Sequence, residues 1–312
     1  MPPFLANTYS IVAYDPQLNQ FGVAIQSHYF RVGAIVPWAE QGVGAVATQA
    51  FVEISYGPLG LALMRTGKMA EYSLHGLLAS DPQADVRQVA MLDANGNVAT
   101  HTGKRCIAEA GHKQGKNYSV QANLMLKDTV WDVMADAYEY ASGDLADRML
   151  ASLEAAEAEG GDIRGAQSAA LLVVSSELTP TPWDGRVFDL RVDDHPEPLV
   201  ELRRLLAISR AYTHAQTASL LLENKPLDES KIAAVDREFQ LAAQSPEMQH
   251  NPELLFWHAV DLISAEREEA ALPLFKQVFD QDPSWRDLVP RLVPAELIPN
   301  DPALIERILQ VA

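Results

Sequence analysis

Residues 8–27, TYSIVAYDPQLNQFGVAIQS, contain two apolar runs separated by a short polar segment. The runs 8–14 and 21–27 are rich in β-branched and aromatic residues, which favour strands. Pro16 and Asn19 lie between the runs and favour a turn. This stretch therefore predicts a β-hairpin, and the remaining elements are placed relative to it.

Downstream of the hairpin, strand-like and helix-like segments alternate in pairs. Apolar residues recur with the helical period of 3.6 in some segments, whereas others are continuous apolar runs or flank an Asn95-Gly96 turn. Strands are predicted at 33–36, 42–50, 86–92, 98–101, 118–126, 168–175 and 187–192. Helices are predicted at 57–66 and 68–80, separated by Gly67 and closed by Asp81-Pro82, and at 128–140 and 145–158. The order predicts an α+β fold with helices on both faces of β layers.

The C-terminal part is almost wholly helical. Residues 199–222 predict one long amphipathic helix, and Lys225-Pro226 marks its end. The apolar spacing over residues 252–285 is typical of a tetratricopeptide-like helix pair. We therefore expect a short leader at 1–7, a main domain at 8–225 and a small all-α extension at 226–312.

Composition and charge restrict the classes of partner. The chain has 312 residues, 24 Lys plus Arg against 42 Asp plus Glu, and a net charge of -18. Such a surface repels phosphate backbones and anionic lipid, so we expect neither a nucleic-acid nor a membrane partner. The single Cys106 cannot form an intramolecular disulfide, and no apolar run approaches the ~20 residues of a membrane span. We expect a cytoplasmic protein.

Two polar segments are candidate sites. Asp193-Asp194-His195 follows a strand and is either a metal half-site, an acid and base pair, or a turn that caps the next helix. Together with His101 these residues define one alternative, a metal-dependent hydrolase. The sequence contains no His-Glu-x-x-His, Gly-x-Ser-x-Gly or Walker motif to support a standard assignment.

The second segment, residues 160–168, is GGDIRGAQS. Its glycines bring Asp162, Arg164 and Gln167 together just before a buried strand. Arginine binds carboxylates in a bidentate fork, so the segment indicates an anion or amide pocket. The alternative is an ordinary polar loop with an internal Asp–Arg pair.

Thr8 is a candidate nucleophile by one mechanism. If residues 1–7 were removed by a cut at the Asn7–Thr8 bond, Thr8 would carry both its hydroxyl and a free α-amine. The amine has a pKa of about 8 and can act as the general base for the hydroxyl. The alternative is a common strand threonine preceded by a disordered leader.

Six blocks of sequence, in order, resemble the DUF1028 family over about residues 8–206. That family is similar to the N-terminal-nucleophile (Ntn) hydrolases, and the resemblance implies a four-layer αββα sandwich, with a C-terminal extension similar to those of some members. Thr8 falls where members have Thr or Ser beside the initiator Met. Here seven residues must be removed, by attack of the Thr8 hydroxyl on the Asn7 carbonyl or by a separate protease. The blocks are TYSIVA (8–13), ATQAF (47–51) with SYGP (55–58), HTG (101–103), YSVQAN (118–123), GGDIR (160–164) with QSA (167–169), and LRVDDH (190–195).

The resemblance implies an amidohydrolase that cleaves a small amide or peptide-like substrate without a metal or other cofactor. Thr8 would attack the amide carbonyl, and Asp162 and Arg164 would orient the substrate. Candidate oxyanion donors on neighbouring strands are Gln26, Thr48, Gln49 and Asn123. The alternative is a catalytically inactive Ntn-like domain that binds a ligand or a protein, with the acidic helical tail as docking surface. A homodimer is expected in either case.

Overall fold

The computed structural model describes residues 5–181, 183–223, 227–248 and 251–311. Contacts divide the chain into two compact units, Met1–Arg203 and Arg204–Ala312. The division falls within helix α5 (Pro198–Glu223), whereas the sequence placed the boundary near residue 225. Helix α5 ends at Glu223, and Lys225 and Pro226 lie outside the described residues.

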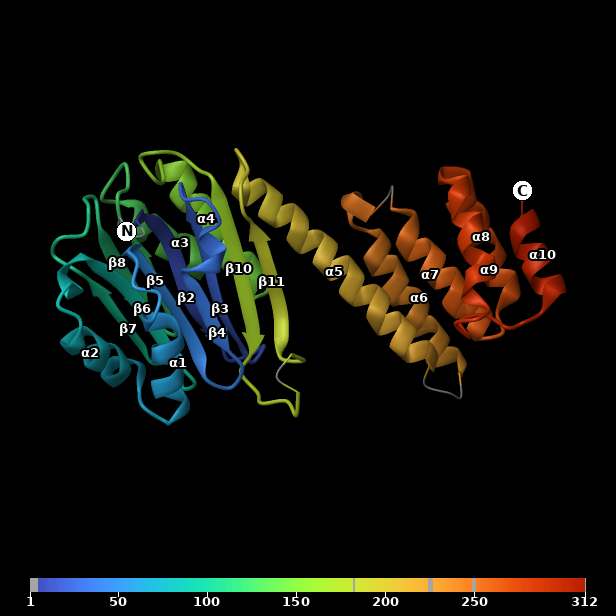
Figure 1. The fold of residues 1–312 in the computed structure, drawn as a ribbon, viewed down its shortest axis with the longest axis horizontal. Coiled ribbons are helices and arrows are strands. Elements are labelled where there is room, and N and C mark those ends of the chain that lie inside the picture. Colours follow the sequence, from blue (N-terminus) through green and yellow to red (C-terminus); the bar gives the residue numbers. More distant parts are fainter. Residues whose placement is uncertain (1–4, 182, 224–226, 249–250, 312) are drawn as a thin grey trace. The chain divides into compact units, whose positions relative to one another are not determined.

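The N-terminal hairpin lies inside a six-stranded antiparallel sheet (Figure 1). Strands β2 (Thr8–Asp15) and β3 (Gln20–Ser27) confirm the predicted hairpin, and Thr8 lies opposite Ser27 in their register. The strand order is β11-β10-β3-β2-β9-β8. The outer strands are β8 (Gly111–Gly115), β9 (Tyr118–Ala122), β10 (Ser168–Ser175) and β11 (Arg186–Val192).

A second antiparallel sheet stacks on the first. Its path is β1-β5-β6-β7, formed by β1 (Leu5–Ala6), β5 (Gly44–Phe51), β6 (Arg87–Asp93) and β7 (Val98–Thr102), with β4 (Pro37–Glu40) also paired to β5. Strands β2 and β3 contact β5 across the interface, and β7 contacts β8 and β9. The apolar core between the sheets contains Val12, Phe21, Ile25, Ala47 and Leu92.

The strand predicted at 33–36 is wrong. Residues Val32–Ala34 form a 3-10 turn, because Arg31 adopts a left-handed conformation and accepts the Ala34 N–H. Both Val32 and Val36 are nevertheless buried in the core between the sheets. A short apolar run is therefore not sufficient to predict a strand.

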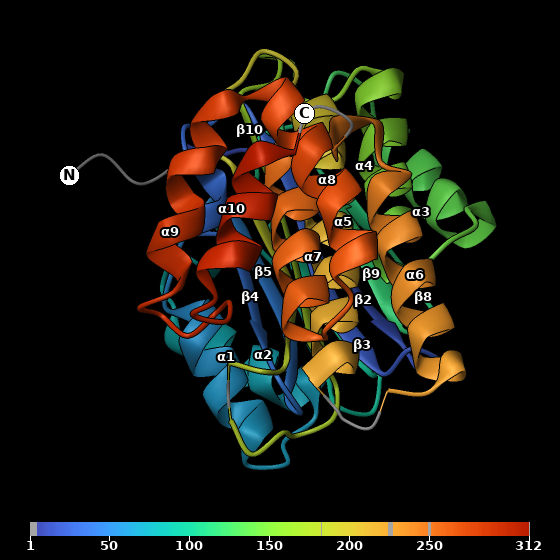
Figure 2. The same ribbon diagram turned by 90° about the vertical axis from the view of Figure 1, so that its right-hand side faces the viewer.

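Helix pairs cover the outer faces of both sheets. Helices α1 (Tyr56–Arg65) and α2 (Ala70–Ser80) contact the five-stranded sheet, and α3 (Val130–Tyr140) and α4 (Leu145–Glu159) contact the six-stranded sheet. Figure 2 shows the two pairs on opposite sides of the strands. These elements confirm the predicted α+β class and helix positions.

The C-terminal unit is helical, as predicted. After α5 come α6 (Glu229–Ala243), α7 (Pro252–Ser264), α8 (Glu268–Gln281), α9 (Val289–Leu292) and α10 (Pro302–Gln310). Helices α7 and α8 pack together around Phe256, Phe275 and Phe279. The tetratricopeptide-like assignment of this pair stays a prediction.

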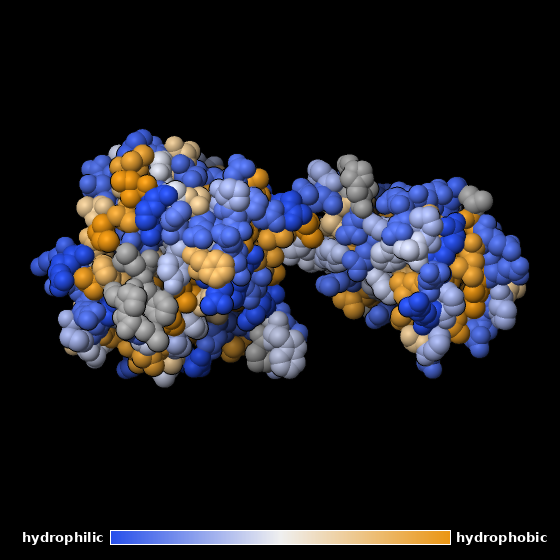
Figure 3. Space-filling view, turned by 45° about the horizontal axis from the view of Figure 1, so that its top comes forward, coloured by the Kyte–Doolittle hydropathy of each residue, from blue (hydrophilic) through white to orange (hydrophobic). Residues whose placement is uncertain are grey.

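Charged and polar residues predominate on the face drawn in Figure 3, where apolar side chains are scattered over both units. No helix within the described ranges has the length and apolar character needed to cross a membrane.

Candidate functional site

Thr8 lies where the chain passes from one sheet to the other. Leu5 and Ala6 form β1 of the five-stranded sheet, Asn7 makes the crossing, and Thr8 begins β2 of the six-stranded sheet. Thr8 is 0% exposed, and its hydroxyl donates to the Ala6 carbonyl at 2.8 Å. The candidate nucleophile is therefore inaccessible while the segment before it is in place.

The Asn7 carbonyl, which precedes the Thr8 nitrogen, accepts two side-chain hydrogen bonds. Ser27 Oγ donates to it at 2.5 Å and Arg164 Nη2 at 3.1 Å. Such donors withdraw electron density from a carbonyl and stabilise negative charge that develops on its oxygen, above all when one of them is a cation. The Asn7–Thr8 peptide bond is thus polarised within a buried site.

Asp162 fixes the Arg164 guanidinium in this position. Arg164 Nε and Nη2 donate to the two Asp162 oxygens at 3.0 and 2.7 Å, and the Asp162 side chain is fully buried. Asp162 also accepts the His28 N–H at 3.3 Å. The internal Asp–Arg pair of residues 160–168 is present and directs Arg164 to the carbonyl beside Thr8, whereas the anion or amide pocket stays a prediction.

Buried amide side chains hold the Thr8 carbonyl. Gln49 Nε2 and Asn123 Nδ2 donate to Thr8 O at 3.2 and 3.3 Å, and both also donate to Gln88 Oε1, at 2.7 and 2.9 Å. Ser10 Oγ donates to Gln49 Oε1 at 2.6 Å. The sequence analysis named Gln49 and Asn123 as oxyanion donors, a role that stays a prediction, because here they bind the Thr8 carbonyl. It missed Gln88, whose only signal is an amide inside an apolar strand.

The other two predicted donors lie on the wrong faces of their sheets. Gln26 is opposite Tyr9, one residue out of phase with Thr8, so its side chain is on the face that carries α4. Thr48 is likewise one residue out of phase with Gln49, and its hydroxyl donates to Glu53 O at 3.1 Å. Side chains alternate along a strand, so proximity in sequence did not place these two beside Thr8.

The predicted polar turn at 193–195 makes structural hydrogen bonds. His195 Nδ1 accepts from Glu197 N at 3.0 Å, Gln167 Nε2 donates to Asp194 Oδ1 at 3.0 Å, and the Asp193 carbonyl accepts the Arg31 N–H. Elsewhere, His101 Nε2 lies 2.8 Å from Ala84 O. In the described part of the chain, no three His, Cys, Asp or Glu side chains form a metal-binding group, so the geometry does not bring His101 to Asp193, Asp194 and His195.

A surface pocket of about 520 Å³ lies beside the amide network. Thr102, in its lining, accepts from Gln88 Nε2 at 2.9 Å and lies 2.9 Å from His112 Nδ1. Burial, with a smaller effect of His101, lowers the pKa of His112, which favours its neutral form. Burial raises the pKa of Cys106 to about 11, so the thiol is a poor nucleophile at neutral pH.

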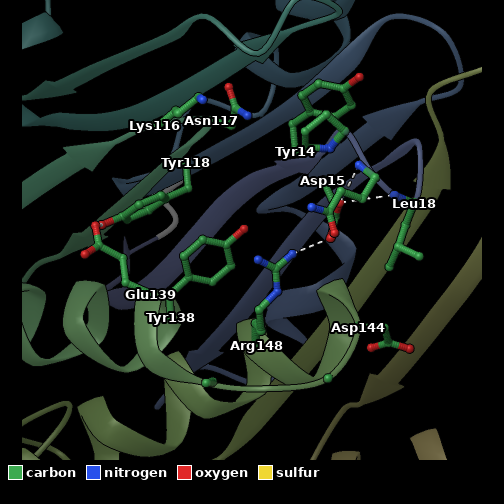
Figure 4. Close-up of a pocket in the computed structure, with 14 residues that line it drawn as sticks. Tyr14, Asp15, Leu18, Lys116, Asn117, Tyr118, Tyr138, Glu139, Asp144 and Arg148 are labelled. Atoms are coloured by element: carbon green, nitrogen blue, oxygen red, sulfur yellow. Dashed lines mark hydrogen bonds and ion pairs between the residues drawn. The ribbon is translucent and has the colours of Figure 1, made fainter.

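A larger pocket, of about 750 Å³, lies at the other end of β2 (Figure 4). Arg148 forms an ion pair with Asp15 and lies over the Tyr138 ring, 5.1 Å from its centroid. Burial raises the pKa of Tyr138 to about 12, so its phenol stays protonated. Because Tyr14 and Asp15 end the strand that Thr8 begins, this pocket is separate from the Thr8 site.

A family model and a solved structure both relate the chain to one family. The model of a family of unknown function, DUF1028, matches residues 8–202. The chain is also similar to the crystal structure of a DUF1028 protein from Silicibacter pomeroyi, with 28% identity and a TM-score of 0.57 over 64% of this chain and 88% of that one. No curated protein matches the sequence. The match begins at Thr8 and covers most of the main domain, and the chain belongs to the DUF1028 family.

Proposed function

We propose that the protein is an amide hydrolase of the N-terminal-nucleophile type, with Thr8 as nucleophile after removal of residues 1–7. Two stacked sheets, each covered by a helix pair, fit the four-layer αββα sandwich of such enzymes. The observation that carries the proposal is the Asn7 carbonyl, held by Ser27 and Arg164 at the bond that must break.

Processing would use the same groups. The Thr8 hydroxyl attacks the Asn7 carbonyl carbon, the C–N bond breaks, and the hydroxyl proton passes to the departing nitrogen. An ester between Asn7 and Thr8 Oγ results, and water hydrolyses it to leave a free α-amine. Ser27 and Arg164 stabilise the oxyanion in both steps.

Turnover would repeat this chemistry on a substrate amide. The α-amine takes the proton of the Thr8 hydroxyl, the oxygen attacks the amide carbonyl, and the same two donors hold the oxyanion. The C–N bond then breaks, the α-amine gives the proton to the departing amine, and water hydrolyses the ester on Thr8 Oγ to release the acid. Thr8 is fully buried with the preceding residues in place, so turnover also requires that the site open to a substrate when the leader is removed. Gln49 and Asn123 keep the Thr8 backbone in place.

Intact mass and N-terminal sequencing of the purified protein test the proposal. Wild type is expected to begin at Thr8, Thr8→Ala to retain Asn7, and Thr8→Ser to be processed. Loss of the leader from Thr8→Ala would identify a separate protease instead. Retention of Asn7 by wild type, together with no amidase activity, would overturn the proposal.

A second candidate function is ligand binding by a catalytically inactive domain. The pocket of about 750 Å³ around Asp15, Tyr138 and Arg148 favours it, because this pocket is open without any processing. The cytoplasmic location, the homodimer and the protein-docking role of the helical tail are further proposals from the sequence. An unprocessed wild-type chain would make ligand binding the better hypothesis.

A further inference from the structure

The segment before Thr8 occupies the site as a bound peptide would. Leu5 and Ala6 form an antiparallel strand on β5, with Leu5 opposite Phe51 and Ala6 opposite Ala50. On its other edge β5 pairs with β6 along almost its whole length, so β1 and β4 share the remaining edge. Since β4 reaches only Ala47, removal of the leader frees the edge at Ala50 and Phe51 for a new strand.

From this geometry, we infer that the processed enzyme takes extended peptides whose acyl side replaces the leader. The residue before the scissile bond lies where Asn7 lies, and the two residues before that lie where Ala6 and Leu5 pair with β5, as an added strand. Ser27 and Arg164 hold the scissile carbonyl. This inference rests on the proposed function and adds a substrate class to it.

Burial restricts the side chains that fit. Ala6 is 0% exposed and belongs to the core between the sheets with Val36 and Val52, so a larger residue at this position meets packed side chains. Asn7 is 1% exposed, and both polar atoms of its side chain lack a protein partner. The site therefore selects an alanine-sized residue followed by a residue no larger than asparagine.

The strand geometry also makes the product a ligand. Cleavage before Thr8 leaves a peptide that ends in Asn7 with a free carboxylate, next to the Arg164 guanidinium. Arg164 Nη2 donates a stronger, charge-assisted hydrogen bond to a carboxylate oxygen than to an amide carbonyl. We therefore expect the released segment to inhibit the enzyme competitively until it is diluted.

Hydrolysis of short peptide anilides tests the inference. The reference substrate is acetyl-Phe-Leu-Ala-Asn p-nitroanilide, which copies residues 4–7. Replacing its Ala by Leu, or removing its first three residues, is expected to lower kcat/KM at least tenfold. Two further substrates carry an N-methyl group, one on the Leu nitrogen and the other on the Ala nitrogen. The methyl group on the nitrogen whose N–H faces β5 should lower kcat/KM about tenfold, because about one hydrogen bond is lost.

Failure of the substrate inference and failure of the proposed function can be distinguished, because the intact mass of the same preparation is measured first. A chain that begins at Thr8 and hydrolyses acetyl-Asn p-nitroanilide as fast as the tetrapeptide, without response to Leu or N-methylation, overturns the substrate class but leaves the amidase proposal standing. A chain that retains Asn7 and cleaves none of the anilides overturns both. Competitive inhibition by acetyl-Phe-Leu-Ala-Asn, lost in the Leu-for-Ala peptide, supports the added strand independently.

Discussion

The two units of the chain have interiors of opposite character. At the Thr8 end of the N-terminal unit, the space between the sheets contains fully buried polar side chains that bond to one another: Ser10, Gln49, Gln88, Ser119, Gln121 and Asn123. The C-terminal unit instead buries Phe256, Phe275 and Phe279 in an apolar cluster. Apolar packing is the more direct source of stability, whereas buried amides must recover their desolvation cost through hydrogen bonds.

The difference indicates which unit is organised around a site. A satisfied polar network fixes positions more narrowly than apolar packing does, and here it fixes the carbonyl of Thr8. The C-terminal core is held by apolar contacts among aromatic rings. We therefore expect mutations in the two interiors to separate stability from chemistry.

The largest effect is expected from Phe256→Ala in the C-terminal core. The Phe256 ring packs edge-on against Phe275 and Trp257, and its removal leaves a cavity that costs about 3–5 kcal/mol. Urea unfolding followed by fluorescence would measure the loss, and hydrogen exchange with mass spectrometry would locate it in α7 and α8. Processing at Thr8 should be unchanged.

Leu241→Ala in α6 is the control, because this side chain is 37% exposed and should cost about 1 kcal/mol or less. Equal destabilisation by both variants would contradict the view that the C-terminal unit depends on its aromatic core. Loss of processing in Phe256→Ala would break the separation between the two interiors.

A smaller loss of stability is expected from Gln88→Met in the polar interior. Gln88 Nε2 donates to Thr102 Oγ1, Gly111 O and Ala122 O, and its Oε1 accepts from Gln49 and Asn123. Methionine keeps the length of the side chain but leaves these groups without their hydrogen bonds to residue 88, which lowers the free energy of unfolding by about 2–3 kcal/mol. Unlike Phe256→Ala, this variant should also slow processing, measured as the fraction of chains that begin at Thr8. A stable, normally processed variant would show that the network is dispensable.

Much of the fold could be predicted from local pattern, because the hairpin, the helix pairs and the helical tail each repeat apolar residues with a clear period. Strands β1, β4 and β8 were missed. They are short or polar, and β8 (GHKQG) forms a strand because β9 offers it a partner, which is tertiary information.

The site could be predicted only in part for a related reason. Thr8 was singled out by the resemblance to the DUF1028 family, and Asp162 and Arg164 by their chemistry and glycine-rich context. Which amides face Thr8 depends on strand register, which separates Gln49 from Thr48 by a single residue. The role of Gln88 could not be predicted from an amide in an apolar strand, because that role requires two stacked sheets.

Acid should affect the C-terminal interior more than the amide network, since amides do not titrate. Burial, with a smaller effect of Arg267, lowers the pKa of His258 to about 4, and its Nε2 is buried without a partner. The unfolded chain binds this proton near pH 6.5 and the folded chain only near pH 4. His258 therefore lowers stability as pH falls from about 6.5 to 4, by about 2 kcal/mol at most after partial exposure is allowed for.

His258→Gln is expected to remove this part of the pH dependence. Urea unfolding of wild type and variant at pH 7 and pH 4.5 would measure it, with the α7 and α8 signal compared between them. Identical pH dependence of the two proteins would show that His258 ionises as freely in the folded chain as in the unfolded one.

The smallest expected change in stability, Gln26→Met, compares the two faces of one sheet. Gln26 is as deeply buried as Gln88, yet neither of its amide atoms has a protein partner, and it lies on the α4 side, away from Thr8. Methionine removes the unpaired amide at similar volume, so stability should be unchanged or rise by up to about 1 kcal/mol. Processing and anilide hydrolysis should stay at wild-type rates, whereas Asn123→Leu, on the Thr8 face, should impair both. Loss of activity in a folded Gln26→Met variant would contradict the argument from strand register. Gln26 would then be an oxyanion donor that reaches the site by a rearrangement after processing.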